Sequence, residues 1–85
     1  MVKGDFSITK PELIKKIENA PLDNDVEFVE IVSSMSKFFS RSKLADALRV
    51  SCPTIERWSG GMNLPYSSMR KPAFRCFVAL LKNED

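Results

Sequence analysis

The sequence predicts an all-α protein, a compact bundle of about five helices, and three observations support this prediction. Apolar residues recur at intervals of three and four along most of the chain, as they do on one face of a helix. Helix-starting residues precede these stretches. The alternation of apolar and polar residues that indicates a strand persists nowhere. We therefore expect one helical domain over residues 1–85.

The N-terminal part, residues 9–37, is expected to form a helical extension. Thr9 and Glu12 fit a capping box with a proline in the first turn, which predicts a helix from residue 10 to about residue 19. A second helix begins after Asn24 or Asp23 as its cap and ends near residue 37. Its apolar residues are Val26, Phe28, Val29, Ile31, Val32 and Met35, and Phe38 and Phe39 behind it are expected in the core.

Residues 41–60 predict two short helices that cross at a tight turn. Ser40 is suited to cap the first helix and Ser51 the second, and Pro53 fits the first turn of the second helix, where the missing amide proton costs nothing. The inward-facing residues are spaced as two packed helices require. They are Leu44, Ala45, Leu48, Val50, Ile55 and Trp58.

A final helix is predicted over residues 71–82, opened by Pro72. Its apolar stripe is expected to comprise Ala73, Phe74, Phe77, Val78 and Leu81. Together with Leu80, these apolar residues are too many for one face of a helix. The sequence therefore predicts that a second subunit covers some of them, in a homodimer.

Charge is distributed unevenly along the chain, whose net charge is only +2. Residues 1–39 hold five basic and seven acidic side chains, net −2, whereas residues 40–85 hold eight basic and four acidic ones, net +4. A basic half that coincides with a two-helix motif favours a polyanionic partner.

This motif resembles the helix-turn-helix of the phage-repressor class, the Xre and Cro family. The resemblance covers about a quarter of the chain, and Asn63, Pro65 and the terminal helix extend it to nearly half. Arg49 departs from the family, which usually has glycine in the turn, and a left-handed backbone there costs about 1 kcal/mol. The matching residues are Leu44, Ala45, Leu48, Val50, Ser51, Ile55, Arg57, Trp58 and Gly60.

The resemblance implies a sequence-specific DNA-binding protein, a transcriptional regulator of the repressor type, with residues 51–59 in the major groove of double-stranded DNA. A homodimer would read two half-sites about 34 Å apart. The guanidinium of Arg57 suits a guanine edge or a phosphate, although it could instead pair with Glu56 or Glu84 or face solvent. The carboxylate of Glu56 can accept a hydrogen bond from a cytosine amino group. The predicted base-contacting residues are Ser51, Cys52, Pro53, Glu56 and Arg57.

A second group of residues is predicted to contact phosphates. Arg41 lies in the first turn of a helix, where backbone amides also face the DNA. Asn63 resembles a backbone-contacting family position but is equally suited to forming a turn. The alternative for three of these residues is that they belong to an ordinary solvated surface and contact no DNA. They are Lys43, Arg70 and Lys71. The predicted phosphate-contacting residues are Arg41, Lys43, Arg49, Thr54, Asn63, Arg70 and Lys71.

Other classes of function find little support. The chain has no histidine, no glycine-rich phosphate loop and no paired carboxylates at a useful spacing, so we expect no enzyme, cofactor or small-molecule substrate. Cys52 and Cys76 lack the spacing of metal ligands. No apolar run predicts a membrane helix or a signal peptide, so a cytoplasmic, nucleoid-associated protein is expected. The alternative is a helical protein-interaction module, antitoxin-like or adaptor, without specific DNA binding.

Overall fold

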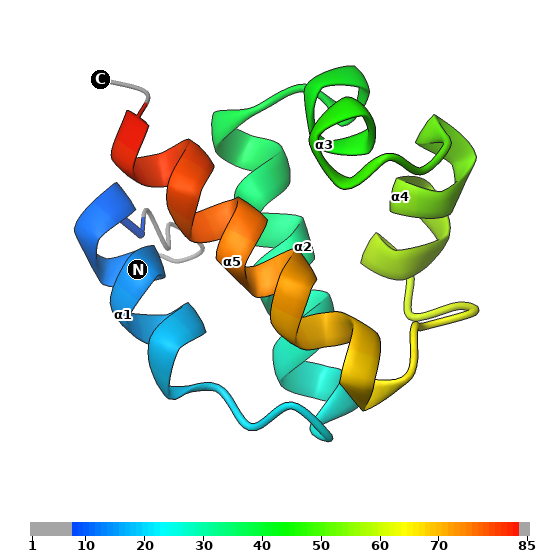
Figure 1. Cartoon of the computed structure of the whole chain (residues 1–85), viewed down its shortest axis with the longest axis horizontal. Helices are drawn as coiled ribbons and strands as arrows, with labels where there is room; N and C mark the ends of the chain where they lie inside the picture. The colour runs from blue at the N-terminus through cyan, green and yellow to red at the C-terminus, as the bar shows by residue number, and fades with distance from the viewer. Residues whose placement is uncertain (1–7, 84–85) are drawn as a thin grey trace, which may run out of the picture.

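The structure, a computed structural model, describes residues 8–83. Within this range the chain forms helices and no strands, which confirms the all-α prediction (Figure 1). The predicted bounds of the first four helices agree with the structure to within about one residue. The helices are α1 (Lys10–Asn19), α2 (Asp25–Phe38), α3 (Arg41–Leu48), α4 (Cys52–Ser59) and α5 (Ser67–Asn83).

Side chains cap the first four helices, as the sequence predicts. The Thr9 and Glu12 side chains each bond the other residue's backbone N–H group in a complete capping box. Of the two candidate caps of α2, Asn24 rather than Asp23 is the cap, because its Oδ1 accepts a hydrogen bond from the N–H of Glu27 at 3.0 Å. These caps satisfy amide groups that would otherwise lack a partner in the first turn. The capping residues are Thr9, Asn24, Ser40 and Ser51.

One apolar core joins all five helices. Phe28 is at its centre, with its ring 5.5 Å from that of Trp58 and 5.7 Å from that of Phe74. Phe39 is buried as predicted, whereas Phe38 is half-buried. The largest fully buried side chains are Phe28, Phe77, Leu13, Ile31, Met35, Leu44, Ile55 and Val32.

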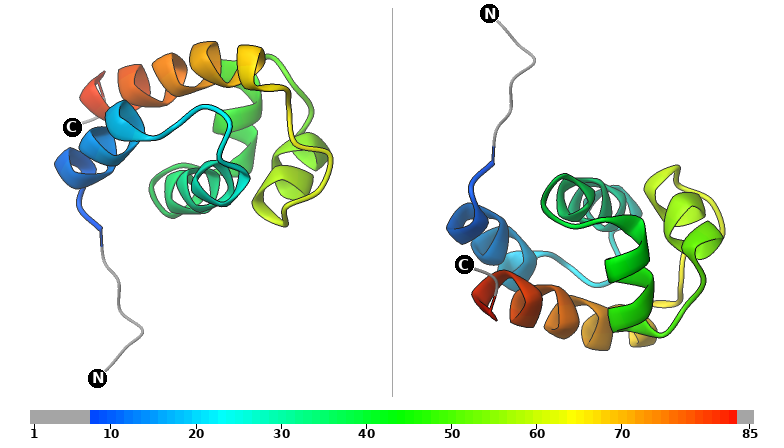
Figure 2. Two further views of the ribbon diagram at one scale, coloured as in Figure 1. Left: turned by 90° about the horizontal axis from the view of Figure 1, so that it is seen from below. Right: turned by 90° about the horizontal axis from the view of Figure 1, so that it is seen from above.

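Two helix pairs lie on opposite sides of α2. Helix α1 packs against α5, and α3 packs against α4. Figures 1 and 2 show α1 and α4 at opposite ends of the molecule, with α5 running between them across α2. The outer surface of α4 is therefore remote from α1.

The structure corrects the start of the last helix. Helix α5 begins at Ser67, four residues before the predicted start, and Pro72 lies inside it. The Met69 N–H group donates to the carbonyl of Tyr66 at 2.8 Å and closes the first turn ahead of the proline. Pro72 lacks only the amide that would bond the carbonyl of Ser68, a loss that the packed helix tolerates. A proline inside a helix was thus mistaken for one at its first turn.

The structure also removes the reason for predicting a dimer. Phe74, Phe77 and Leu81 are buried within this chain, and Val78 and Leu80 are half-buried against the same core. Helix α1 covers this side of α5. The number of apolar residues on α5 therefore no longer requires a second subunit, and the homodimer stays a prediction.

Candidate nucleic-acid interface

The turn between α3 and α4 is built on a left-handed residue. Arg49 has φ 60° and ψ 44°, which is the conformation that a glycine in this turn adopts readily. The Val50 N–H donates to the carbonyl of Ala45 at 2.9 Å, and the Arg49 N–H donates to that of Asp46 at 3.2 Å. These two bonds form a Schellman motif, which ends α3 sharply. Arg49 thus provides the turn that the family forms with glycine, and its side chain is exposed.

Apolar side chains fix α4 against α3 and α2. Leu44, Ala45 and Ile55 are all buried where the helices meet. Trp58 is 8% exposed, and its Nε1–H donates to the carbonyl of Asn63 at 3.1 Å. The prediction that Trp58 belongs to the core rather than to a base-stacking surface is confirmed. One face of α4 is therefore fully used in holding the helix in place.

The N-terminus of α4 is organised by Ser51. Its Oγ accepts from the Thr54 N–H at 3.3 Å and lies 2.8 Å from the Thr54 hydroxyl oxygen. Pro53 follows within the first turn, as predicted. Thr54 is half-buried and its hydroxyl is already bonded, so it reaches a phosphate less easily than an exposed residue would.

The remaining face of α4 is open to solvent. Ser51, Pro53, Glu56 and Arg57 are exposed, and Cys52 is half-buried. Four of the five predicted base-contacting residues therefore lie on α4, and the fifth, Ser51, is its N-cap.

Opposite charges meet between α3 and α4. Arg41 Nη1 lies 2.7 Å from Glu56 Oε2, and both side chains are more than half exposed. Arg57 makes no ion pair within residues 8–83, and its alternative partner Glu84 lies outside the described residues. The sequence did not predict the Arg41–Glu56 pair, because it depends on how the two helices cross. It neutralises the one carboxylate on the outer face of α4.

Helix N-termini differ between the two halves of the chain. The first turn of α1 contains Glu12, and that of α2 contains Asp25 and Glu27. The first turns of α3 and α4 contain no acidic residue. Their partial positive charge is therefore not offset locally, and this favours an anion such as a phosphate.

Two further predicted phosphate contacts lie near α4. Lys43 and Arg49 are exposed and line an open depression of about 1020 Å³ with Cys52, between the starts of α3 and α4. The Lys43 ammonium is also 5.7 Å from the centre of the Phe39 ring. Asp46 also lines the depression, so its lining residues carry a net charge of +1. Polar walls with a net positive charge are compatible with part of a DNA backbone.

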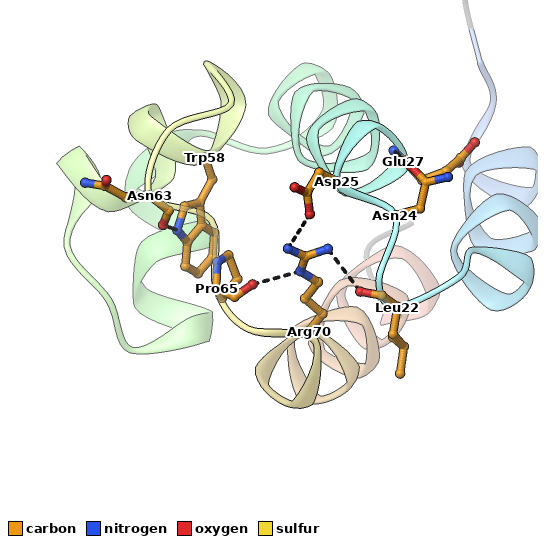
Figure 3. Close-up of polar contacts among 8 residues, drawn as sticks. All are labelled: Leu22, Asn24, Asp25, Glu27, Trp58, Asn63, Pro65 and Arg70. Atoms are coloured by element: carbon orange, nitrogen blue, oxygen red, sulfur yellow. Dashed lines mark hydrogen bonds and ion pairs between the residues drawn. The ribbon is translucent and has the colours of Figure 1, made fainter.

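Asn63 is a turn residue in this structure. Its φ is 51°, and its carbonyl accepts the Trp58 indole bond described above. Its exposed side chain points away from the Trp58 ring (Figure 3), which leaves the amide open to solvent. The alternative reading of Asn63 as a turn former is therefore confirmed, while its contact with DNA stays a prediction.

The structure corrects the prediction that Arg70 contacts a phosphate, because the side chain of Arg70 is buried. The residue is 5% exposed, and its guanidinium donates to the carbonyls of Pro65 at 2.9 Å and Leu22 at 3.0 Å (Figure 3). It also pairs with Asp25 at 2.7 Å. These partners occupy all three nitrogens of the guanidinium, so Arg70 is a structural clamp between α5 and the start of α2 and is not available to a phosphate.

Lys71 is exposed but is not brought together with α4. It lines a groove between α1 and α5 instead. Its position in α5 therefore separates it from the other predicted phosphate contacts.

Three further features of the described residues concern metal, membrane and thiol chemistry. Among the described residues, no three His, Cys, Asp or Glu side chains cluster as metal ligands would. No helix in residues 8–83 is both long and apolar enough to cross a membrane. Cys52 and Cys76 are free and half-buried. Comparisons with models of protein families, with curated proteins and with solved structures find no match.

Proposed function

We propose that this protein is a sequence-specific DNA-binding protein, a transcriptional regulator of the phage-repressor type, that inserts α4 into the major groove. The observation that carries the proposal is the division of α4 into two faces. Ile55 and Trp58 hold one face in the core, and Arg57 stands on the opposite face without an ion pair in the described chain. A rigid helix with an open polar face is what reading of base edges requires.

Electrostatics supports the same face. Residues 40–63 contain four basic and two acidic side chains, so this unit carries a net charge of +2. The Arg41–Glu56 pair holds one of the two acids, which reduces repulsion of phosphates by Glu56. Neutralised phosphates release counterions, so binding is expected to weaken steeply with salt.

Each residue has a role in this proposal. The base-contacting residues are Ser51, Cys52, Pro53, Glu56 and Arg57, and Glu56 has a second carboxylate oxygen, besides the one that pairs with Arg41, that can accept from a cytosine amino group. Binding as a homodimer to half-sites about 34 Å apart, in the nucleoid, belongs to the proposal as well. The phosphate-contacting residues are Arg41, Lys43, Arg49, Thr54 and Asn63.

The proposal is tested by selecting bound sequences from a random pool of duplex DNA. We expect one enriched motif, and a symmetric motif if the protein binds as a dimer. Failure to enrich any sequence, with binding that does not respond to salt, would favour a helical protein-interaction module instead.

Arg57→Ala then tests the contact itself. We expect affinity for the selected duplex to fall by about fivefold to 160-fold, because an arginine fork contributes about 1–3 kcal/mol at a base edge. Stability in urea should change by less than about 0.5 kcal/mol, because the side chain is exposed. The matched control is Lys15→Ala on α1, which also removes one exposed positive charge and should leave affinity nearly unchanged. Equal affinities for the two variants would refute the role of Arg57.

A further inference from the structure

A groove lies between α1 and α5 and follows α5 from Lys71 to Lys82. Figures 1 and 2 show α1 and α4 at opposite ends of the molecule, with α5 running between them. Its volume is about 570 Å³. Ile17 and Phe74 are buried at its base, and Leu22 and Val78 are half-buried along its walls. The base of the groove is therefore an apolar surface that is accessible from outside the buried core.

Positive charge lines this apolar floor. Lys71, Arg75 and Lys82 are exposed at its edge, and none of them makes an ion pair within the part of the chain that the structure describes. Their spacing of four and seven residues places them along one side of α5. Among the described residues, Glu18 is the one acidic residue that lines the groove, so the described lining residues carry a net charge of +2.

The spread of these charges decides between kinds of ligand. Lys82 lies eleven residues after Lys71, which corresponds to about 16 Å along the helix. A small amphiphile with one anionic head could neutralise the cations at one end of the groove only. A helical segment with an apolar stripe and several acidic residues could fill the floor and meet the cations at both ends.

We propose that this groove docks an acidic amphipathic helix of a partner protein. The apolar stripe of that helix would cover Leu22 and Val78, and its carboxylates would pair with Lys71, Arg75 and Lys82. The residues that line the groove come from neither α3 nor α4, so the groove and the outer face of α4 are separate surfaces and both can be occupied at once. This proposal rests on the groove alone and holds whether or not α4 binds DNA.

The test uses the full chain, isotope-labelled for NMR, and a synthetic amphipathic helix of about four turns, with leucines on one face and glutamates on both flanks. At low salt we expect saturable shift changes at residues lining the groove and none at α4. A matched peptide with glutamine in place of glutamate should bind at least about tenfold more weakly, because the charge complementarity is lost.

Two protein variants locate the site. Arg75→Glu should weaken peptide binding at least about tenfold, whereas Lys15→Glu, an equal charge reversal at an exposed position of α1 outside the groove, should change it less than about threefold. Ala79→Trp adds a second measurement, because it fills the groove from an exposed position. It should block peptide binding without unfolding the protein, which the spectrum itself reports.

Several results would overturn the proposal. No saturable shift at the groove with millimolar peptide would do so, as would equal binding of the glutamate and glutamine peptides. Occupation by dodecanoate but not by the peptide would assign the groove to a small amphiphile. Concentration-dependent shifts at the groove without any peptide would assign it to a second copy of the chain.

Discussion

The helix pairs α1–α2 and α3–α4 handle charge in different ways. On α1, Lys16 bonds Glu30 at 3.1 Å and Glu27 at 3.2 Å, both from α2. The hydrogen bond to Glu30 is the main cause that raises the pKa of Lys16 above its ordinary value. On α3 and α4, Arg49 and Arg57 have no such partner in the described chain.

This difference shows which of the two helix pairs carries positive charge that is not paired within the described chain. The lysine of the first pair already interacts with acids of its own fold, so it contributes little attraction for an outside anion. The second pair keeps two arginines that make no ion pair in the described chain, and the first turns of its helices contain no acidic residue. This local pairing, rather than the small net charge of the chain, is what distinguishes the two helix pairs.

The largest expected effect concerns Arg70, a basic residue of the C-terminal half that is nevertheless paired by its own fold. Arg70→Ala removes two bonds to backbone carbonyls and the ion pair with Asp25, and it should lower the free energy of unfolding by about 3 kcal/mol. Urea unfolding measures this change.

Asp25→Asn is the control for Arg70. Its side chain is 67% exposed and the amide keeps an acceptor oxygen, so the loss should stay below about 1 kcal/mol. If Arg70→Ala proved as mild as Asp25→Asn, the guanidinium would not be the clamp described here, and Arg70 would return to the set of exposed cations.

Arg70 also shows what the sequence could and could not provide. Its partners Leu22 and Asp25 lie more than 40 residues away in sequence, so no local pattern could identify them. One signal was present, however. Arg70 stands three and four residues before Ala73 and Phe74, on the buried side of α5. That spacing could have placed Arg70 inward.

The rest of the fold was predictable where local chemistry decides it. Caps and apolar spacing gave the bounds of the first four helices, because serine, threonine and asparagine side chains satisfy the first amides of a helix directly. The start of α5 was missed because Pro72 is tolerated inside the helix. The Arg41–Glu56 pair and the cover of α5 by α1 depend on tertiary packing, which spacing alone does not contain.

A smaller effect is expected at Arg49, where the turn of the second pair is strained. Arg49→Gly should raise the free energy of unfolding by about 0.5 kcal/mol, because glycine adopts φ 60° without the cost of a Cβ. The same change should weaken DNA binding, because one exposed cation is lost.

Arg49→Ala separates these two effects. It removes the same charge but keeps a Cβ in the left-handed conformation, so it should weaken DNA binding without the gain in stability. Equal stability of the glycine and alanine variants would argue against strain at this turn.

The smallest effect concerns the capping box of α1. The bond from the Thr9 backbone N–H, followed by that from its hydroxyl, lowers the pKa of Glu12 below its ordinary value of 4.5. The depressed pKa means that the associated stability is present above pH 4.5 and is lost as pH falls through the folded-state pKa.

NMR titration of Glu12 measures this shift. In Thr9→Ala the hydroxyl bond is absent, and the pKa of Glu12 should move back toward its ordinary value. An unchanged pKa in that variant would show that the backbone N–H alone causes the shift.

The proposed contact between the outer face of α4 and double-stranded DNA can be observed by NMR titration of the isotope-labelled full chain with a short duplex at low salt. We expect the largest shift changes at residues 51–57 and around Arg41 and Arg49, with α1 and its groove nearly unaffected. Largest changes on α1 and α5, or no saturable change at all, would contradict it.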